Sequence, residues 1–298
     1  MKLNAHLTRT CLSCVCLCLP CISNGANSVD ICRESVDESY LSIAYYDSEE
    51  ASFESNLGET NRENYSADLR LTLNNNWVIG GGLRSTVLNV DRLALQTNGY
   101  LHSIFLPLHR VSRSENTSFR FSIAPTLSAS SNITKNPSEY TSDALQLLAT
   151  LVWRRQISDR VDLRYGICGD HRFGEYRVYP IFSVNWQPHT SWLIELGLPS
   201  SQLNYQVTKS LASIVRIAPN GNEWQVKDKS LEKHSQLIYE AYIVEWLFNW
   251  RVYEHFMLTA SVGREFHGRY EMTLLNENRV RLESDPATQI GVAMAWFF

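Results

Sequence analysis

The chain has 298 residues, of which 44% are hydrophobic and 19% are charged, and its formal net charge is −4 at pH 7. This weakly acidic balance argues against a nucleic-acid partner, because nucleic acids bind clustered basic surfaces. Beyond residue 25 no apolar run approaches the ~20 residues that a membrane-spanning helix requires. A membrane location would therefore depend on strands.

The N-terminal 26 residues have the three parts of a secretory signal peptide. Lys2 and Arg9 supply positive charge, residues 11–22 form a short apolar core, and small residues such as Ser23 and Ala26 follow. We therefore predict a signal peptide over 1–26. Its removal would take the net charge to −6, because it carries two basic and no acidic residues.

Five of the seven cysteines lie in this leader. A metal or redox motif is the alternative interpretation, but the spacing lacks paired CxxC elements with a distant second pair. Cleavage would leave Cys32 and Cys168. Two cysteines so far apart do not predict a disulfide framework, and we expect Cys168 to be a small buried residue.

Alternation of apolar and polar residues with a period of two runs through most of the remaining chain. In one segment Tyr65, Leu69 and Leu71 alternate with Asp68 and Arg70. The pattern recurs in five further segments, at 119–127, 161–168, 178–186, 241–251 and 256–263. No segment has a comparable helical period, so the sequence predicts an all-β fold.

The last nine residues form an alternating strand that ends in aromatic residues. One face carries Ile290, Val292, Met294, Trp296 and Phe298. Such an edge invites aggregation in a soluble protein, whereas a closed barrel in lipid has no free edge and requires an apolar exterior. The pattern resembles the C-terminal strand that outer-membrane barrels present to their insertion machinery. We interpret Trp296 and Phe298 as that membrane insertion signal.

Short turns alternate with longer polar connections, which we expect at 47–63, 129–140, 228–234 and 275–286. Outer-membrane barrels have short periplasmic turns and long external loops. With both termini in the periplasm, this alternation predicts an up-and-down antiparallel barrel of about 14 strands. Leu198-Pro199-Ser200 is either an external hairpin between two short strands or a kink within one strand, and the kink would give 12 strands.

The competing fold is a soluble β-sandwich or lipocalin-like barrel, whose apolar face points inward. Aromatic residues near predicted strand ends, such as Trp186 and Trp192, favour a membrane barrel. Charges of both signs on the opposite face also favour a polar interior. We predict a periplasmic segment or partial plug over 27–38 and a transmembrane barrel over 39–298.

The region from Arg164 to Val226 carries a set of short motifs. They are Arg164-Tyr165-Gly166, Tyr179-Pro180, Val184-Asn185-Trp186-Gln187-Pro188, Trp192-Leu193, Leu196-Gly197-Leu198-Pro199, Leu203-Asn204-Tyr205-Gln206 and Asn222-Glu223-Trp224-Gln225-Val226. With these motifs, about a fifth of the chain resembles a family of uncharacterised outer-membrane β-barrel proteins, domain-of-unknown-function family 6268. The resemblance implies an outer-membrane barrel behind a signal peptide. It brings no catalytic residues, because the family has no assigned activity. Where the family would have glycines before Trp224, this chain has Pro219-Asn220-Gly221-Asn222.

Charged residues with the parity of the non-lipid face are the candidates for lining the lumen. They are Asp68, Arg70, Arg120, Arg154, Asp162, Arg164, Asp170, Arg172 and Arg177. On one interpretation they line a permeation path and tune its selectivity. On the other they pair across strands and brace a closed barrel, which is the interpretation we favour for most of them.

The sequence predicts no catalytic residue, no metal site and no cofactor. The strongest catalytic arrangements are His102-Ser103 and His171 beside Asp170, but no GxSxG elbow accompanies them. The histidines form no HxH or HExxH pair. We therefore expect a protein that is not an enzyme.

These observations favour a porin-like channel or a structural barrel in the cell outer membrane. The expected partners are outer-membrane lipids, the barrel-insertion machinery and small solutes. The alternatives are a lipid-modifying outer-membrane enzyme, or an adhesin or scaffold acting through external loops at 47–63 and 275–286.

Overall fold

The computed structural model describes residues 31–32, 39–54, 58–74, 76–91, 99–228, 233–273 and 279–298. The predicted signal peptide, and all but two residues of the predicted segment 27–38, lie outside this set. Among the described residues, no helix is long and apolar enough to cross a bilayer. The strands are β1 Tyr40–Ser52, β2 Glu59–Thr72, β3 Trp77–Asp91, β4 Gly99–Phe105, β5 Leu108–Arg113, β6 Thr117–Ser130, β7 Leu145–Ser158, β8 Val161–Asp170, β9 Arg177–His189, β10 Trp192–Leu198, β11 Ser201–Gln206, β12 Leu211–Pro219, β13 Asn222–Asp228, β14 Lys233–Tyr253, β15 Phe256–Thr273, β16 Arg279–Ser284 and β17 Thr288–Phe297.

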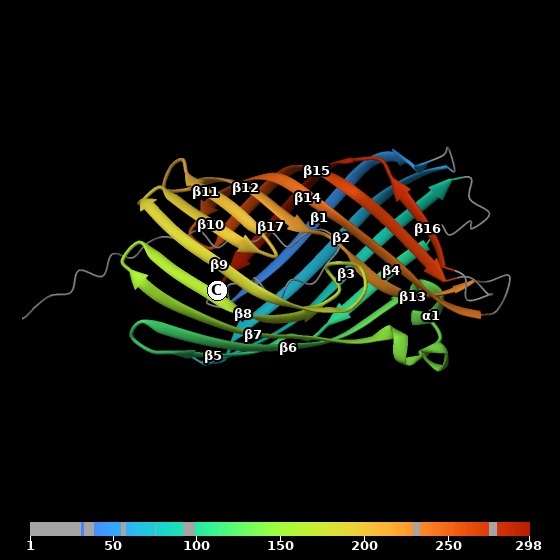
Figure 1. The fold of residues 1–298 in the computed structure, drawn as a ribbon, viewed down its shortest axis with the longest axis horizontal. Helices are drawn as coiled ribbons and strands as arrows, with labels where there is room; N and C mark the ends of the chain where they lie inside the picture. The colour runs from blue at the N-terminus through green and yellow to red at the C-terminus, as the bar shows by residue number, and fades with distance from the viewer. Residues whose placement is uncertain are drawn as a thin grey trace, which may run out of the picture.

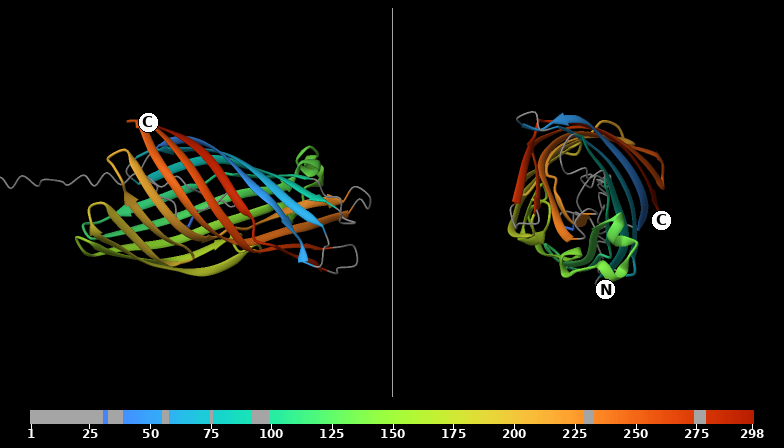
Figure 2. Two further views of the ribbon diagram at one scale, coloured as in Figure 1. Left: turned by 90° about the horizontal axis from the view of Figure 1, so that it is seen from above. Right: turned by 90° about the vertical axis from the view of Figure 1, so that its right-hand side faces the viewer.

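The described strands join into one closed antiparallel ring (Figures 1 and 2). The first and last strands close it, with register from Tyr40↔Phe297 to Ser48↔Gln289. Three positions in the ring hold two consecutive strands each. β4 and β5 both lie between β3 and β6, β12 and β13 both pair with β14, and β16 and β17 both pair with β15. The ring therefore has 14 positions, which confirms the predicted architecture.

β10 and β11 form a short hairpin around Pro199 and Ser200. They pair with each other from Trp192↔Tyr205 to Glu195↔Gln202, β10 pairs with β9, and β11 pairs with β12. The hairpin interpretation of this segment is therefore correct. The 12-strand alternative is wrong, because these residues occupy two ring positions rather than one kinked strand.

Apolar side chains point outward and polar ones inward. On β17, Ile290 is 58% exposed whereas Gln289 is 3% exposed, and on β2 Leu69 is exposed while Asp68 and Arg70 are buried. The soluble lipocalin-like alternative requires the opposite arrangement. An apolar exterior around a ring without free edges is the solution that a hydrocarbon environment imposes.

Two predicted long connections are shorter than expected. β1 continues to Ser52 and β2 begins at Glu59, so most of 47–63 is strand, and β16 occupies 279–284. The polar composition of this segment predicted a loop, but polar residues such as Asp47 and Glu63 pair between the two strands. A strand that extends beyond the hydrocarbon layer is free to be polar on both faces, so polarity there does not indicate a loop.

The connection between β6 and β7 is long, as predicted, and it is structured. It contains α1 Ser131–Thr134 and two 3₁₀ turns, η2 Pro137–Glu139 and η3 Ser142–Ala144. This connection packs against β13, where the Thr141 backbone N–H donates to the Gln225 side chain and Lys227 pairs with Glu139 at 2.9 Å. It therefore fixes β13 relative to β6.

The barrel is pinched at the end that carries the longer connections. Here β13 contacts β6 through a parallel bridge, Gln225↔Ala129, and Phe53, which follows β1, forms an isolated bridge with Ser284 of β16. The described strands at this level form a smaller closed ring, made by β1, β2, β3, β4, β6, β13, β14, β15 and β16. Strands β7 to β11 lie outside this nine-strand ring.

The interior of the nine-strand ring is an apolar core. Its buried members are Phe53, Leu88, Val90, Leu101, Trp224, Val226, Leu237, Tyr239, Ala241, Tyr270 and Met272. A barrel of about eight strands is just narrow enough for its own side chains to fill. The pinch therefore brings the ring to a size at which side chains close the lumen, which the full ring of 14 strands exceeds.

Gly221 allows close packing of the chain just before β13 against β14 and the β8–β9 connection. A Cβ at this position would lie 2.6 Å from the Tyr239 carbonyl oxygen, 2.7 Å from the Gly174 nitrogen and 2.8 Å from the Arg172 carbonyl oxygen. All three are backbone atoms, so no side chain can move aside to relieve the contact. The absence of a side chain here lets the β8–β9 connection pack directly against the start of β13.

We expect Gly221→Ala to destabilise the barrel by about 1–3 kcal/mol, the usual range for overpacking. The measurement is the urea midpoint of heat-modifiable gel migration. Gly81→Ala is the matched control, because its Cβ would lie 3.5 Å from a Leu106 methyl group in ordinary contact. Equal midpoints for the two variants would contradict the assigned role of Gly221.

Candidate functional site

The inner wall of the wide part of the barrel is lined with charged residues that are paired. Asp68 accepts a hydrogen bond from Arg84 at 2.7 Å, and both side chains are buried. The Arg70 guanidinium lies 4.9 Å from the centre of the Tyr40 ring, a cation–π arrangement. The two predicted residues therefore lie among partners on the wall.

Two further predicted residues form an ion pair close to the short turns. Arg154 donates two hydrogen bonds to the Asp162 carboxylate, from Nε at 3.0 Å and from Nη2 at 2.8 Å. Asn185 donates to the same carboxylate at 2.8 Å. Arg177 lies elsewhere, at the start of β9, 3.7 Å from Glu240. Arg177 has the same inward parity along its strand as the other predicted lumen residues. Its contact with Glu240 places it at the end of the barrel that carries the longer connections.

Sequence reasoning missed two buried ion pairs, Arg62 with Glu265 and Arg216 with Glu245. Arg216 and Glu245 are directly opposite one another on β12 and β14. The alternation along the strand could have shown that Glu245 faces inward, since its neighbour Trp246 faces outward. The partner was not predictable until β12 and β14 were known to be neighbours. Cross-strand pairs of this kind brace a sheet.

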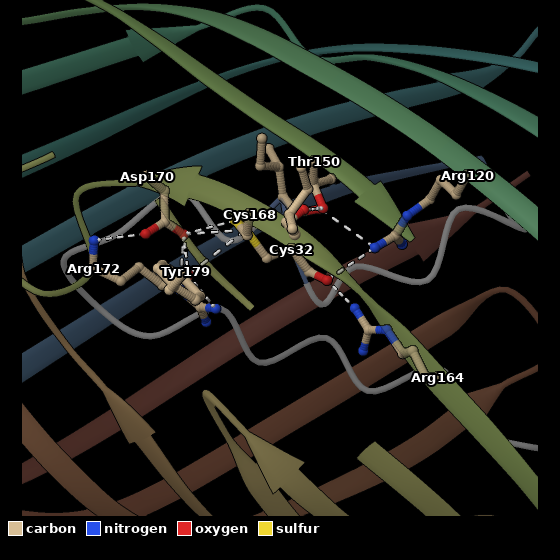
Figure 3. A network of polar contacts seen from close by, with 10 residues as sticks. Cys32, Arg120, Thr150, Arg164, Cys168, Asp170, Arg172 and Tyr179 are labelled. Atoms are coloured by element: carbon tan, nitrogen blue, oxygen red, sulfur yellow. Dashed lines mark hydrogen bonds and ion pairs between the residues drawn. A yellow bond between two sulfur atoms is a disulfide. The ribbon is translucent and has the colours of Figure 1, made fainter. Parts of the chain in front are cut away.

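The largest departure from expectation is a disulfide between Cys32 and Cys168, whose Cα atoms are 5.9 Å apart and 136 residues apart in sequence. This pairing was not predicted from the sequence, because two distant cysteines predict no disulfide framework. Their separation along the chain carries no information about distance once the barrel folds. Cys168 is on the inner face of β8, and Cys32 lies inside the barrel against it (Figure 3).

The tethered dipeptide Ile31–Cys32 covers an apolar patch on the inner wall. Both residues are buried and pack in one cluster with residues of β4, β6, β7, β8 and β9, namely Phe105, Ala124, Leu148, Val152, Cys168 and Ile181. An apolar patch facing an aqueous lumen would be unfavourable if left bare. The described part of segment 27–38 is therefore packed as a piece of the interior.

Polar groups surround this dipeptide (Figure 3). Arg120 donates to the Cys32 carbonyl oxygen at 3.0 Å, and Arg164 donates to the same oxygen. On the other side, Asp170 accepts a hydrogen bond from the Tyr179 hydroxyl at 2.8 Å and pairs with Arg172 at 3.1 Å. Four of the nine predicted residues thus meet at one place.

Cys32, Cys168 and Asp170 have the donor types of a metal site, and their ligand atoms all lie within 4.8 Å of one another. Metal binding requires deprotonated thiolates, whereas these two sulfurs are bonded to each other. The Asp170 carboxylate is engaged by Arg172 and Tyr179. The group is therefore a covalent tether rather than a cation site in this state.

His102 and Ser103, the pair considered above for catalysis, do not contact each other in the way that catalysis requires. The two residues point to opposite faces of β4. His102 contacts Ser85 through Nδ1 at 2.9 Å and Ser131 through Nε2 at 2.8 Å, while Ser103 contacts Ser128 at 2.8 Å. The second nitrogen of His102 thus meets a hydroxyl where a catalytic triad would have a carboxylate.

His171 does not act with Asp170 either. Its Nδ1 lies 3.0 Å from Glu223 of β13, and its ring lies 5.3 Å from that of Tyr176. The contact joins the β8–β9 connection to the pinched part of the barrel. Its position there indicates a structural role.

The closed ring, the apolar exterior and the polar inner wall define an integral β-barrel of the outer-membrane type. Solved structures of similar shape include the KdgM porin in complex with disordered oligogalacturonate, at 10% identity over 86% of this chain and 99% of that chain, with a TM-score of 0.39. Another is the COG4313 outer membrane channel from Pseudomonas putida F1, at 9% identity over 91% and 99%, with a TM-score of 0.47. A third is the Pseudomonas putida toluene transporter TodX, at 10% identity over 88% and 90%, with a TM-score of 0.36. No family model and no curated protein matches the sequence.

The assignment to the outer membrane follows from this chain's own ring and exterior. Hydrogen bonds between neighbouring strands satisfy the backbone around the whole ring, and the outward residues are those that hydrocarbon accepts. The protein is an outer-membrane β-barrel of unassigned activity.

Removal of one partner from a buried ion pair should be costly. We expect Glu245→Ala, which deletes the carboxylate facing Arg216, to destabilise the barrel by about 3–5 kcal/mol. The control is Glu283→Ala, whose carboxylate pairs with Arg281 at 2.8 Å on the exposed surface and should contribute at most about 1 kcal/mol. Urea titration followed by tryptophan fluorescence measures both, and similar losses would contradict a bracing role for the buried pair.

The disulfide makes a direct prediction for thiol chemistry. Protein extracted from outer membranes and denatured without reductant should add no maleimide at Cys32 or Cys168, and should add one at each of these two positions after reduction. Cys32→Ser should leave one reactive thiol, at Cys168, without reductant. Mass spectrometry measures the additions. Two reactive thiols in the unreduced wild-type protein would show that the tether does not form.

Proposed function

We propose that the protein is a porin-like channel for small solutes and that the structure shows its closed form. The observation that carries the proposal is the contrast between the two ends of the barrel. Fourteen strands enclose more space than side chains fill, and the wide part is lined with charges. The narrow part is sealed by an apolar core.

The seal has the character of a gate. It depends on β13, which is held inward by one parallel bridge to β6 and by polar contacts with the β6–β7 connection. Apolar constrictions exclude water and ions from a pore without blocking it covalently. Outward movement of β13 would enlarge the ring and hydrate the core.

The predicted domain organisation supports the same function. A signal peptide over 1–26 would direct export, and segment 27–38 would enter the barrel as a partial plug, which the buried Ile31–Cys32 supports. N-terminal sequencing of the protein from outer membranes would test the cleavage site. A start downstream of Cys32 would remove the plug from the proposal.

The insertion machinery and the family are finer parts of the proposal. Trp296 and Phe298 alternate with buried Ala295 and Phe297 at the end of the chain. The exposed face of this segment would be the one that the insertion machinery binds. Membership of domain-of-unknown-function family 6268 is supported by the motifs between Arg164 and Val226. Loss of membrane assembly in a Phe298→Ser variant would support the signal, and normal assembly would count against it.

A sealed scaffold is the second candidate, and the apolar core of the nine-strand ring favours it. In that case the ion pairs would brace a barrel that never opens. Most of the predicted adhesin loop 47–63 is strand, and β16 occupies residues 279–284 of the other predicted loop. The β6–β7 connection replaces them as the most extensive described connection. The expectation that the protein is not an enzyme remains a prediction.

Planar bilayer recording separates channel from scaffold. We expect rare, small conductance steps from the wild-type protein and frequent, larger steps from Trp224→Ser, because this change removes bulk from the seal and adds a hydroxyl. The control is Trp246→Ser, since Trp246 faces outward and is 48% exposed. Silence from folded wild-type protein and both variants over repeated insertions would favour the scaffold.

A further inference from the structure

Glu265 of β15 is a buried carboxylate that accepts hydrogen bonds from several other parts of the chain. The Arg62 guanidinium of β2 donates to it, the Tyr239 hydroxyl of β14 donates at 3.1 Å, and the Asn220 side chain, just before β13, donates at 2.5 Å. Glu265 is 3% exposed and Arg62 is 4% exposed. One side chain thus connects β2, β14, β15 and the segment that leads into β13.

The pair of Arg62 with Glu265 spans more of the ring than a pair between neighbouring strands. Two strands, β1 and β17, lie between β2 and β15. Arg216 and Glu245, by contrast, are directly opposite each other on β12 and β14, which their backbone hydrogen bonds already join. The contact between Arg62 and Glu265 therefore connects parts of the wall that are not neighbours in the ring.

Asn220 lies at the junction of the wide part of the barrel with the pinched part. It follows β12 and precedes β13. Its backbone exchanges two hydrogen bonds with Ala241 of β14, at 2.8 and 3.0 Å, while its side chain reaches Glu265. Glu265 therefore holds the point at which β13 begins its path toward β6.

The same ion pair contacts the apolar seal. The Arg62 guanidinium lies 3.9 Å from the centre of the Tyr239 ring and 6.0 Å from that of the Tyr270 ring. Both tyrosines belong to the apolar core of the nine-strand ring. Because a cation is attracted to the face of an aromatic ring, movement of Arg62 would be transmitted to the seal.

A recess in the wall leads from exposed residues to this ion pair. It lies where the pairing of β1 with β2 is irregular, between Ser48 and Ala51. Its lining includes the exposed Glu49 and Asp285 together with the buried Arg62, Glu265, Tyr239 and Tyr270. Separating a buried ion pair is costly when the freed charges meet no solvent. Water entering the recess would hydrate them and lower this cost, whereas Arg216 and Glu245 do not line it.

We propose that Glu265 is the latch of the constriction. Bound to Arg62 and Asn220, it holds β13 in the closed position, and its release of these partners opens the lumen. The inference deepens the proposed channel function and rests on it for its biological meaning. Glu265 is a positioning residue, which acts through β13 and the two tyrosines rather than by contact with a solute.

Exposure of the seal measures the latch independently of transport. Val226 of β13 is 7% exposed and belongs to the apolar core, so the substitution Val226→Cys places a thiol inside the seal. Mass spectrometry follows the rate of maleimide addition at this position in folded, detergent-solubilised protein, without reductant so that Cys32 and Cys168 stay bonded. We expect Glu265→Gln to raise the rate at least about tenfold, the effect of losing one charge-assisted hydrogen bond. Asn220→Ala, which keeps the ion pair but removes the contact beside β13, should also raise it and serves if Glu265→Gln does not fold.

The matched control is Glu245→Gln, which makes the same change in the buried pair with Arg216. It should lower the urea midpoint and leave the labelling rate unchanged. Reversal of the charges, by Arg62→Glu together with Glu265→Arg, should restore slow labelling, whereas Arg62→Glu alone should not. Heat-modifiable migration confirms that each variant is folded. Equal labelling rates in the Glu265→Gln and Glu245→Gln proteins would overturn the latch.

Bilayer recording separates the latch from the channel. Glu265→Gln should conduct more often than wild type, as expected for Trp224→Ser. Conductance from Trp224→Ser, with slow labelling and rare steps in Glu265→Gln, would overturn the latch and leave the channel standing. Fast labelling in Glu265→Gln with silence from every folded variant would retain Glu265 as the residue that holds β13 and remove the channel.

Discussion

The interior volume of the barrel is the constraint on which the structure depends. The alternating segments occupy fourteen positions in one ring, but fourteen strands leave more space than side chains fill. An interior that is neither packed nor hydrated is not stable. The chain meets this constraint in two ways, by bending β13 onto β6 at one end and by tethering Ile31–Cys32 to the wall further in.

The two solutions differ chemically because the neighbouring inner walls differ. Within the nine-strand ring, aromatic and aliphatic side chains pack together, and the buried Arg62 guanidinium lies 3.9 Å from the centre of the Tyr239 ring in this cluster. In the wide part, arginines and carboxylates line the wall, and each buried pair offsets the cost of removing its charges from water. The tethered dipeptide combines both, since Ile31 covers an apolar patch and the Cys32 carbonyl accepts from two arginines.

The parts of this arrangement that were predictable from sequence are those that each strand determines alone. Lipid on one side and a polar interior on the other impose a two-residue period on every strand, so Leu69 and Asp68 could be assigned to faces without knowing any neighbour. The same holds for the last strand, whereas the turn count left the segment around Pro199 open between a hairpin and a kink. Extended polar strand ends, such as Asp47 and Glu63, could not be separated from loops, because no lipid constrains them.

The parts that could not be predicted depend on closure of the ring. The disulfide joins Cys32 to a residue that is near only after β8 takes its position, and Arg216 meets Glu245 only because β12 pairs with β14. Trp224 illustrates the same limit. It belongs to the same residue type as the outward-facing tryptophans, and its inward position follows from its register opposite the buried Leu237 of β14.

The burial of the disulfide has a consequence for biogenesis. Cys32 and Cys168 are each 1% exposed, so no oxidoreductase could bring its own cysteines to them inside the finished protein. The covalent link must be made while β8 and the leading segment are still accessible in the periplasm. We therefore expect oxidation to precede the meeting of β1 and β17, so that Ile31–Cys32 is fixed in the interior during assembly.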